Sequence, residues 1–122
     1  VEDAACVTVA NTLLNKADLV AIYGSNEFAA KNIITANESL DKLGADKIIG
    51  VGFDAGKIQL DAVRNGIFAG SITQNPVQIG YQAVELAVKA ANGEEVSDVD
   101  TGALWYTADN IDDEEIAACL YE

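Results

Sequence analysis

The sequence predicts an α/β fold, arranged as a three-layer α/β/α sandwich with a mostly parallel sheet. Short apolar runs of strand length alternate with longer segments in which apolar residues recur at helical spacing. The run 19–24 (LVAIYG) is apolar throughout, which is typical of a strand that is covered on both faces. Strands that alternate with helices in this way are joined by right-handed crossovers, so they lie parallel in one sheet.

The first half of the chain is expected to alternate helix and strand from its start. The expected order is helix, strand, helix, strand, helix, over residues 3–16, 19–24, 27–43, 47–53 and 56–65. In each helix apolar residues stand three and four positions apart, which places them on one face. Gly44 and Gly66 follow the second and third helices, and glycine is the residue that most often ends a helix in the left-handed conformation.

The second half continues the alternation around an acidic link. We expect a strand, a helix, the link, a strand and a last helix, over residues 69–74, 76–91, 94–100, 101–107 and from 112 onward. Pro76 suits the first turn of a helix, where its missing N–H is not needed. That helix carries the apolar residues Ile79, Ala83, Leu86, Ala87 and Ala90 and is expected to stop at Asn92-Gly93. Asp112, with Glu115 three positions later, resembles a capping box, so the acidic run 112–115 indicates a helix start rather than a calcium site.

Composition narrows the classes of function. The 122 residues include 20 acidic and 7 basic side chains, which gives a formal net charge of −13. A field of that sign repels phosphate and argues against a nucleic-acid or anionic-lipid partner. The sequence contains no histidine, so a Ser-His-acid triad is excluded, and we expect no metal site, no cofactor and no enzyme activity. Gly50, Gly52 and Gly56 have the wrong spacing for a dinucleotide-binding fingerprint.

Features near the ends of the chain leave alternatives open. Cys6 and Cys119 are either two buried apolar residues or a disulfide that joins the first and last helices and implies an oxidising compartment.

The chain begins with Val1 rather than Met, and strand 19–24 would leave an unpaired apolar edge, which natural sheets avoid. We therefore expect either that strands precede this segment in the natural protein or that the edge of strand 19–24 pairs with a partner such as a second copy.

Polar side chains stand at the carboxyl ends of three successive strands. They are Asn26, Asp54 and Gln74. Ligands of open parallel sheets bind beyond the carboxyl ends of the strands, so the three side chains are expected at one rim. Their planar groups suit the adjacent hydroxyls of a polyol, each of which can donate and accept a hydrogen bond. The alternative is that each caps a helix or a turn, a frequent role for Asn and Asp but a poor one for Gln.

Three more side chains close to this rim have two interpretations each. Glu27 could form a two-carboxylate pair with Asp54, or it could be the acid that favours a helix N-terminus. Trp105 and Tyr106 could stack on a sugar, but their place on the last strand favours packing.

Four segments carry a resemblance over essentially the whole chain. They are residues 21–27 (AIYGSNE), 49–55 (IGVGFDA), 70–76 (GSITQNP, followed by Gly80-Tyr81) and 106–112 (YTADNID). With them the sequence resembles the second half of a type I periplasmic sugar-binding protein, the ribose- and galactose-binding kind of ABC-transporter receptor. It departs at Glu27, where the family usually has Asp, and at Asn32, where many members have a glycine that packs the helix close to the sheet.

The resemblance implies a two-lobe protein in which residues 1–122 are an incomplete C-terminal ligand-binding lobe, without its upstream strands and the N-terminal lobe. It implies that Asn26, Asp54 and Gln74 hydrogen-bond a monosaccharide between the lobes. The protein would then be the extracytoplasmic solute-binding component of an ABC import system, periplasmic or a cell-surface lipoprotein, and would deliver its sugar to a membrane permease. The alternative that shares this fold and these motifs is the effector-binding core of a lactose-repressor-type transcription regulator.

Overall fold

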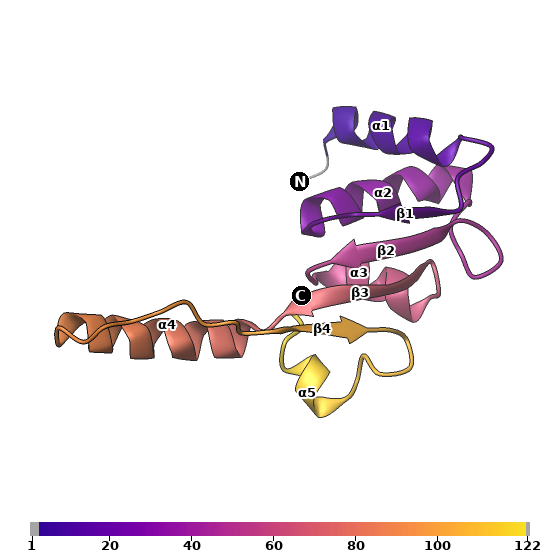
Figure 1. Ribbon diagram of the computed structural model, residues 1–122. Coiled ribbons are helices and arrows are strands. Elements are labelled where there is room, and N and C mark those ends of the chain that lie inside the picture. The colour runs from indigo at the N-terminus through magenta and orange to yellow at the C-terminus, as the bar shows by residue number, and fades with distance from the viewer. Residues whose placement is uncertain (1–2, 122) are drawn as a thin grey trace.

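A computed structural model describes residues 3–121 of the chain (Figure 1). The elements are α1 (Ala4–Leu14), β1 (Ala21–Tyr23), α2 (Glu27–Leu40), β2 (Ile49–Phe53), α3 (Lys57–Arg64), β3 (Phe68–Gln74), α4 (Pro76–Ala91), β4 (Ala103–Tyr106) and α5 (Glu114–Ala117). They follow one another in the order that the sequence predicts. No helix in this part of the chain is both long and apolar enough to span a bilayer.

The four strands form one sheet in the order β1-β2-β3-β4. The first three strands are parallel, with Ala21 beside Ile49 and Gly50 beside Phe68, whereas β4 runs antiparallel to β3. The predicted α/β fold with a mostly parallel sheet is therefore confirmed. Because Gln74 at the end of β3 faces Ala103 at the start of β4, the chain leaves the sheet and returns to it at the same rim.

One face of the sheet is covered by helices and holds the core. In Figure 1, α2 and α3 lie behind the strands, and α1 packs on α2. The buried apolar side chains between these layers include Leu14, Ile33, Ile34, Leu60, Val63 and Phe68. Burial of each large side chain of this kind contributes roughly 1.5–3 kcal/mol to folding. Gly50 is required for this packing, because a Cβ there would lie 2.6 Å from the ring of Phe68.

The opposite face of the sheet is open to solvent over much of its area. Tyr23 on β1, Ile49 on β2 and Trp105 on β4 point to this side and are 52%, 45% and 45% exposed. The ring of Trp105 lies across Gly70 of β3, where any Cβ would collide with it. Residues 3–121 thus supply helices to one face of the sheet, and the second helical layer of the predicted sandwich is not formed by them.

Helix α4 leaves the sheet as a separate arm, with the link to β4 running back along it (Figure 1). None of its residues is buried, and Val77, Tyr81, Val84 and Val88 are all more than half exposed. The apolar residues that the sequence places on this helix, Ile79, Ala83, Leu86, Ala87 and Ala90, are therefore not buried against the sheet. Helical periodicity identified apolar residues on α4, but it does not show what they pack against.

Two helix ends differ from those that the sequence predicts. Helix α2 stops at Leu40 rather than at residue 43, because Asp41 takes the left-handed conformation. The side-chain oxygen of Asn37 then accepts hydrogen bonds from the N–H groups of Lys42 (2.7 Å) and Leu43 (2.9 Å), which takes over the role expected of Gly44.

The expected capping box at the last helix is also wrong. Helix α5 begins at Glu114, and its N-cap residue Asp113 makes no side-chain hydrogen bond to the helix. Asp112 forms an ion pair with Arg64 of α3 instead, at 3.1 Å. The sequence spacing assigned Asp112 to the start of the last helix, but its carboxylate pairs with Arg64 of α3 instead.

The two cysteines are free thiols. Cys6 lies half-buried on α1 and Cys119 is buried just after α5, at opposite ends of the sheet (Figure 1). The structure therefore contradicts the disulfide alternative. Burial raises the pKa of the Cys119 thiol, which keeps it protonated.

Candidate functional site

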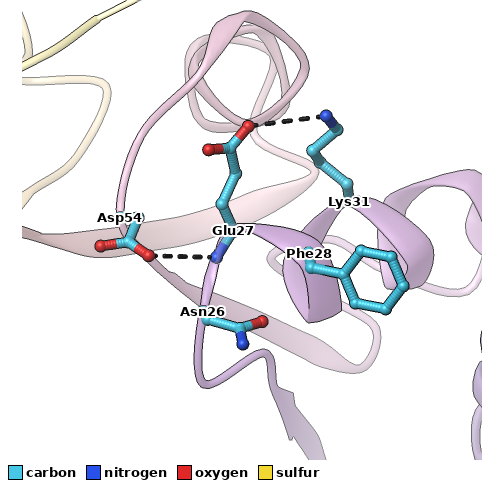
Figure 2. Close-up of a pocket in the computed structure, with 5 residues that line it drawn as sticks. All are labelled: Asn26, Glu27, Phe28, Lys31 and Asp54. Carbon is cyan, nitrogen blue, oxygen red and sulfur yellow. Dashed lines mark hydrogen bonds and ion pairs between the residues drawn. The ribbon is translucent and has the colours of Figure 1, made fainter. Parts of the chain in front are cut away.

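The candidate site is a pocket of about 370 Å³ at the carboxyl ends of β1 and β2. It is lined by Asn26, Glu27, Phe28, Lys31 and Asp54 (Figure 2). The N-terminal end of α2, with its cap Asn26, supplies four of these residues, and the turn after β2 supplies Asp54. Parallel pairing of β1 with β2 places both turns at one rim, as expected from the strand ends.

Asp54 is the centre of the polar contacts at this rim. Its Oδ1 accepts a hydrogen bond of 2.7 Å from the side-chain amide of Gln74, the last residue of β3. Its Oδ2 accepts one of 3.3 Å from the backbone N–H of Glu27. Two of the three residues predicted for the site, Asp54 and Gln74, are therefore in direct contact, and each keeps part of its side chain accessible.

Asn26 combines the two roles that the sequence left open. It is the N-cap of α2, and its Oδ1 accepts a hydrogen bond of 2.8 Å from the N–H of Ala29. Its side chain is exposed and lines the pocket beside Asp54. Within residues 3–121 the amide nitrogen of Asn26 makes no hydrogen bond. The oxygen therefore stabilises the helix, and the nitrogen remains available as a donor to a ligand.

Glu27 does not pair with Asp54 through its carboxylate. Its Oε1 lies 3.5 Å from Nζ of Lys31, and its Oε2 accepts a hydrogen bond of 3.3 Å from the hydroxyl of Tyr121. Glu27 also lies in the first turn of α2, where a negative charge is favourable. The structure thus supports Glu27 as a helix-terminal acid whose carboxylate contacts Lys31 and Tyr121.

Tyr121 joins the end of the chain to this rim. Its hydroxyl donates to Glu27 and accepts a long contact of 3.5 Å from the N–H of Ala55. Burial raises the pKa of Tyr121, and the negative charges of Glu27 and Asp54 add to this effect, while the Ala55 contact opposes it. The tyrosine therefore stays protonated and acts as a donor at neutral pH.

The two aromatic residues of β4 lie outside the pocket. Tyr106 is fully buried, and its hydroxyl donates a hydrogen bond of 2.9 Å to the backbone carbonyl of Asp54. Trp105 lies on the open face of the sheet, against Gly70. Packing, the favoured interpretation, is therefore correct for Tyr106. In the part of the chain that the structure describes, no group of three His, Cys, Asp or Glu side chains is arranged to hold a metal ion.

Sequence reasoning did not identify Phe28, Lys31 and Tyr121 at this rim. Lys31 could have been found, because it stands four positions after Glu27 and such pairs face each other on a helix. Tyr121 carried no comparable signal, since 94 residues separate it from Glu27.

The sequence matches the family described as "Periplasmic binding protein domain" over residues 2–95. The chain belongs to this family. Its type is the type I sugar-binding kind, as the rim motifs indicated. Over 86 residues it is 35% identical to the ribose import binding proteins RbsB of Haemophilus influenzae and Escherichia coli K12, covering 70% of this chain and 28% of theirs.

Solved structures of the type I periplasmic sugar-binding proteins share this fold. A protein from Brachyspira murdochii, described as "ABC transporter, LacI family transcriptional regulator", is 44% identical with a TM-score of 0.89, over 99% of this chain and 41% of its own. An ABC-transporter solute-binding protein from Agrobacterium vitis with bound D-fucose is 30% identical, with a TM-score of 0.86 over 98% and 41%. The chain thus spans less than half the length of the proteins it matches.

Proposed function

We propose that this chain is the C-terminal ligand-binding lobe of a solute receptor that delivers a monosaccharide to an ABC importer. In this proposal Asn26, Asp54 and Gln74 hydrogen-bond the sugar, and a second lobe completes the site. The observation that carries the proposal is the 2.7 Å contact between the Asp54 carboxylate and the Gln74 amide, together with the pocket that Asp54 lines beside Asn26.

The chemistry of these groups suits a polyol. A carboxylate accepts hydrogen bonds at both oxygens, so Asp54 can accept hydrogen bonds from two neighbouring hydroxyls while it retains its bond to Gln74. Bonds to a charged acceptor are shorter and stronger than bonds between neutral groups. Asn26 adds a donor through its amide nitrogen, because its oxygen is already engaged in the helix cap. The rim therefore presents both acceptors and donors at one place.

The relatives support the same class of ligand. The names of the matched sequences describe ribose import binding proteins, and one matched structure contains D-fucose. Another, from Agrobacterium radiobacter, contains D-arabinose and is 27% identical with a TM-score of 0.85. These are binding proteins of transport systems, which supports a receptor outside the cytoplasm that works with a permease and is not an enzyme.

The shape of the chain supports a second lobe. It spans 41% of the length of the first three matched structures, and helix α4 extends away from the sheet with an uncovered apolar side. The chain leaves the sheet at Gln74 and returns to it at Ala103, on the rim that holds the site. The site is open on one side, so further residues of the same protein can close over it.

A thermal-shift measurement tests this function in the complete natural protein. A panel of pentoses and hexoses should raise the melting temperature, because a ligand that binds only the folded state stabilises it, by about 2.7 kcal/mol at one hundred times the dissociation constant. Asn26→Ala and Asp54→Ala should abolish the gain, whereas Asn65→Ala and Asp98→Ala, at exposed positions away from the rim, should retain it. If no sugar in the panel shifts the unaltered protein, the proposed function is wrong.

One observation keeps a second candidate, the effector-binding core of a transcription regulator. The name of the Brachyspira murdochii structure includes "LacI family transcriptional regulator". Sugar binding would be the same in both cases, so the decisive measurement is location. Fractionation of the source cells should recover a transport receptor outside the cytoplasmic membrane. Recovery in the cytoplasm, together with retention on DNA, would support the regulator instead.

A further inference from the structure

Asp54 has an unusual backbone conformation for a residue with a side chain. Its φ is +70°, in the left-handed region, although it is not a glycine and does not end a helix. The only other described non-glycine residue with a positive φ is Asp41, which caps α2. A Cβ in this region is crowded by the neighbouring carbonyl, so the conformation persists only where the surroundings impose it.

The surroundings of Asp54 converge on its backbone carbonyl oxygen. That oxygen accepts hydrogen bonds from the Gln59 side-chain amide (3.0 Å), the Ser71 hydroxyl (3.2 Å) and the Tyr106 hydroxyl (2.9 Å). The three donors come from α3, β3 and β4. The backbone N–H of Asp54 is held as well, by a bond of 2.7 Å to the carbonyl of Ile72. Both the N–H and the carbonyl of this residue are therefore held by groups from neighbouring elements of the fold.

The three donors are all fully buried behind the rim. Gln59, Ser71 and Tyr106 are 0% exposed. Gly52 makes room for them, because a Cβ at that position would lie 2.5 Å from the Gln59 amide nitrogen and 2.9 Å from the Ser71 hydroxyl. The carbonyl oxygen of the Gln59 side chain is buried without a hydrogen-bond partner. A buried unpaired acceptor is costly, so this arrangement keeps the Gln59 N–H groups directed at the turn at the expense of its own oxygen.

We propose that Gln59, Ser71 and Tyr106 are positioning residues for the ligand. They hold the Asp54 peptide in the left-handed conformation, and this directs the carboxylate toward Gln74, the Glu27 N–H and the pocket. Loss of a donor allows the Asp54 backbone to relax to a negative φ, which rotates Cβ and withdraws the carboxylate from the rim. The role in ligand binding rests on the sugar-binding function proposed above, whereas the role in holding Asp54 does not.

The first test follows the carboxylate without any sugar. In the complete natural protein, Tyr106→Phe removes one of the three bonds that the Asp54 carbonyl accepts. The bonds from Glu27 and Gln74 to the Asp54 carboxylate should then weaken, so that the Glu27 amide hydrogen exchanges about tenfold faster and the Gln74 side-chain amide resonances shift. Ser71→Ala provides a second variant that removes a different donor. Asn37→Ala is the matched control, because it removes buried bonds to Lys42 and Leu43 at the other end of α2. It should speed exchange there and leave Glu27 unchanged.

The second test measures sugar affinity by calorimetry in the same variants. Tyr106→Phe and Ser71→Ala should weaken binding by about tenfold, as is typical when support behind a ligand-binding group is removed. Asn37→Ala should lower the melting temperature and leave the affinity unchanged. Unaltered Glu27 exchange and Gln74 resonances in both donor variants would overturn the positioning role. If these signals change as expected but no sugar binds the unaltered protein, the positioning of Asp54 stands and the proposed function fails.

Discussion

At the scale of single residues, the candidate site depends on side chains that each serve two contacts. Asn26 caps α2 with its oxygen and keeps its nitrogen for the pocket, while Asp54 accepts bonds from Gln74 and from the N–H of Glu27. For Asn26, capping and ligand binding are therefore compatible interpretations. A variant that keeps a capping oxygen but lacks the amide nitrogen can distinguish the contribution to helix stability from the contribution to ligand binding.

Substitution of Asn26 separates these two roles. Asn26→Ser retains an oxygen that can cap α2 but lacks the amide nitrogen, so stability should be nearly unchanged while sugar affinity falls. Asn26→Ala removes both groups and should lower the free energy of unfolding by about 1 kcal/mol as well. Urea denaturation and calorimetric titration of the complete protein measure the two effects. Asp3→Ala is the matched control, because it removes the cap of a different helix, α1. If Asn26→Ser binds sugar normally, Asn26 is a cap alone.

The polar residues of the rim could be predicted from the sequence, because their place along the chain, after a strand, determines where they lie in the fold. Asn26, Asp54 and Gln74 stand at strand ends, and parallel pairing brings strand ends together. Tyr106, Tyr121 and Gln59 were not predictable as parts of the site. Their contacts with the rim depend on the antiparallel return of β4 and on the turn after β2, which no local pattern in the sequence specifies.

At the scale of elements, local signals identified each helix but not its neighbours. Helix α4 begins at Pro76 as expected, yet it packs on no strand. The left-handed Asp41 ends α2 before Gly44, and Arg64 pairs with Asp112 in place of a helix cap. In each case the helix lies where the sequence predicts it. How it ends or packs is determined by a contact or backbone conformation that the spacing of its apolar residues does not indicate.

Hydrogen exchange of α4 tests whether the rest of the protein covers it. A 16-residue helix without tertiary packing is only marginally stable in water, so its amides should exchange much faster than those of α2 in the 122-residue chain. In the complete natural protein the same amides should become protected if the second lobe proposed above covers Val77, Val84 and Val88. Exchange measured by mass spectrometry compares the two forms, with α2 as the internal reference. Equal rates for α4 in both forms would show that no further lobe packs on it.

At the scale of the whole molecule, the surface charge is largely unbalanced. Among residues 3–121, five ion pairs engage five of the seven cationic side chains, and all of them are partly exposed, so they add little to stability. Most of the 20 acidic groups therefore have no cationic partner within the described residues. Repulsion between copies with a charge of −13 opposes contact through the apolar edge of β1 and the open sheet face.

The 122-residue chain should associate when salt screens this repulsion. Sedimentation velocity should show a shift from monomer toward dimer as ionic strength rises, with the edge of β1 as the contact. Val20→Lys adds a charge at that edge, where Val20 is 77% exposed, and should restore the monomer. Val88→Lys adds the same charge on α4 and should have no effect. If only the α4 variant restores the monomer, the arm is the interface, and a monomer at every salt concentration excludes association through β1.

The position of Trp105 gives the chain an intrinsic optical reporter. It is the only tryptophan among the 122 residues, it pairs with Ile72 on β3, and it lies half-exposed on the uncovered face of the sheet. Its emission maximum and its accessibility to a quencher such as iodide respond to whatever layer packs there. Fluorescence of the unlabelled chain therefore reads out the docking of a second helical layer, independently of any ligand.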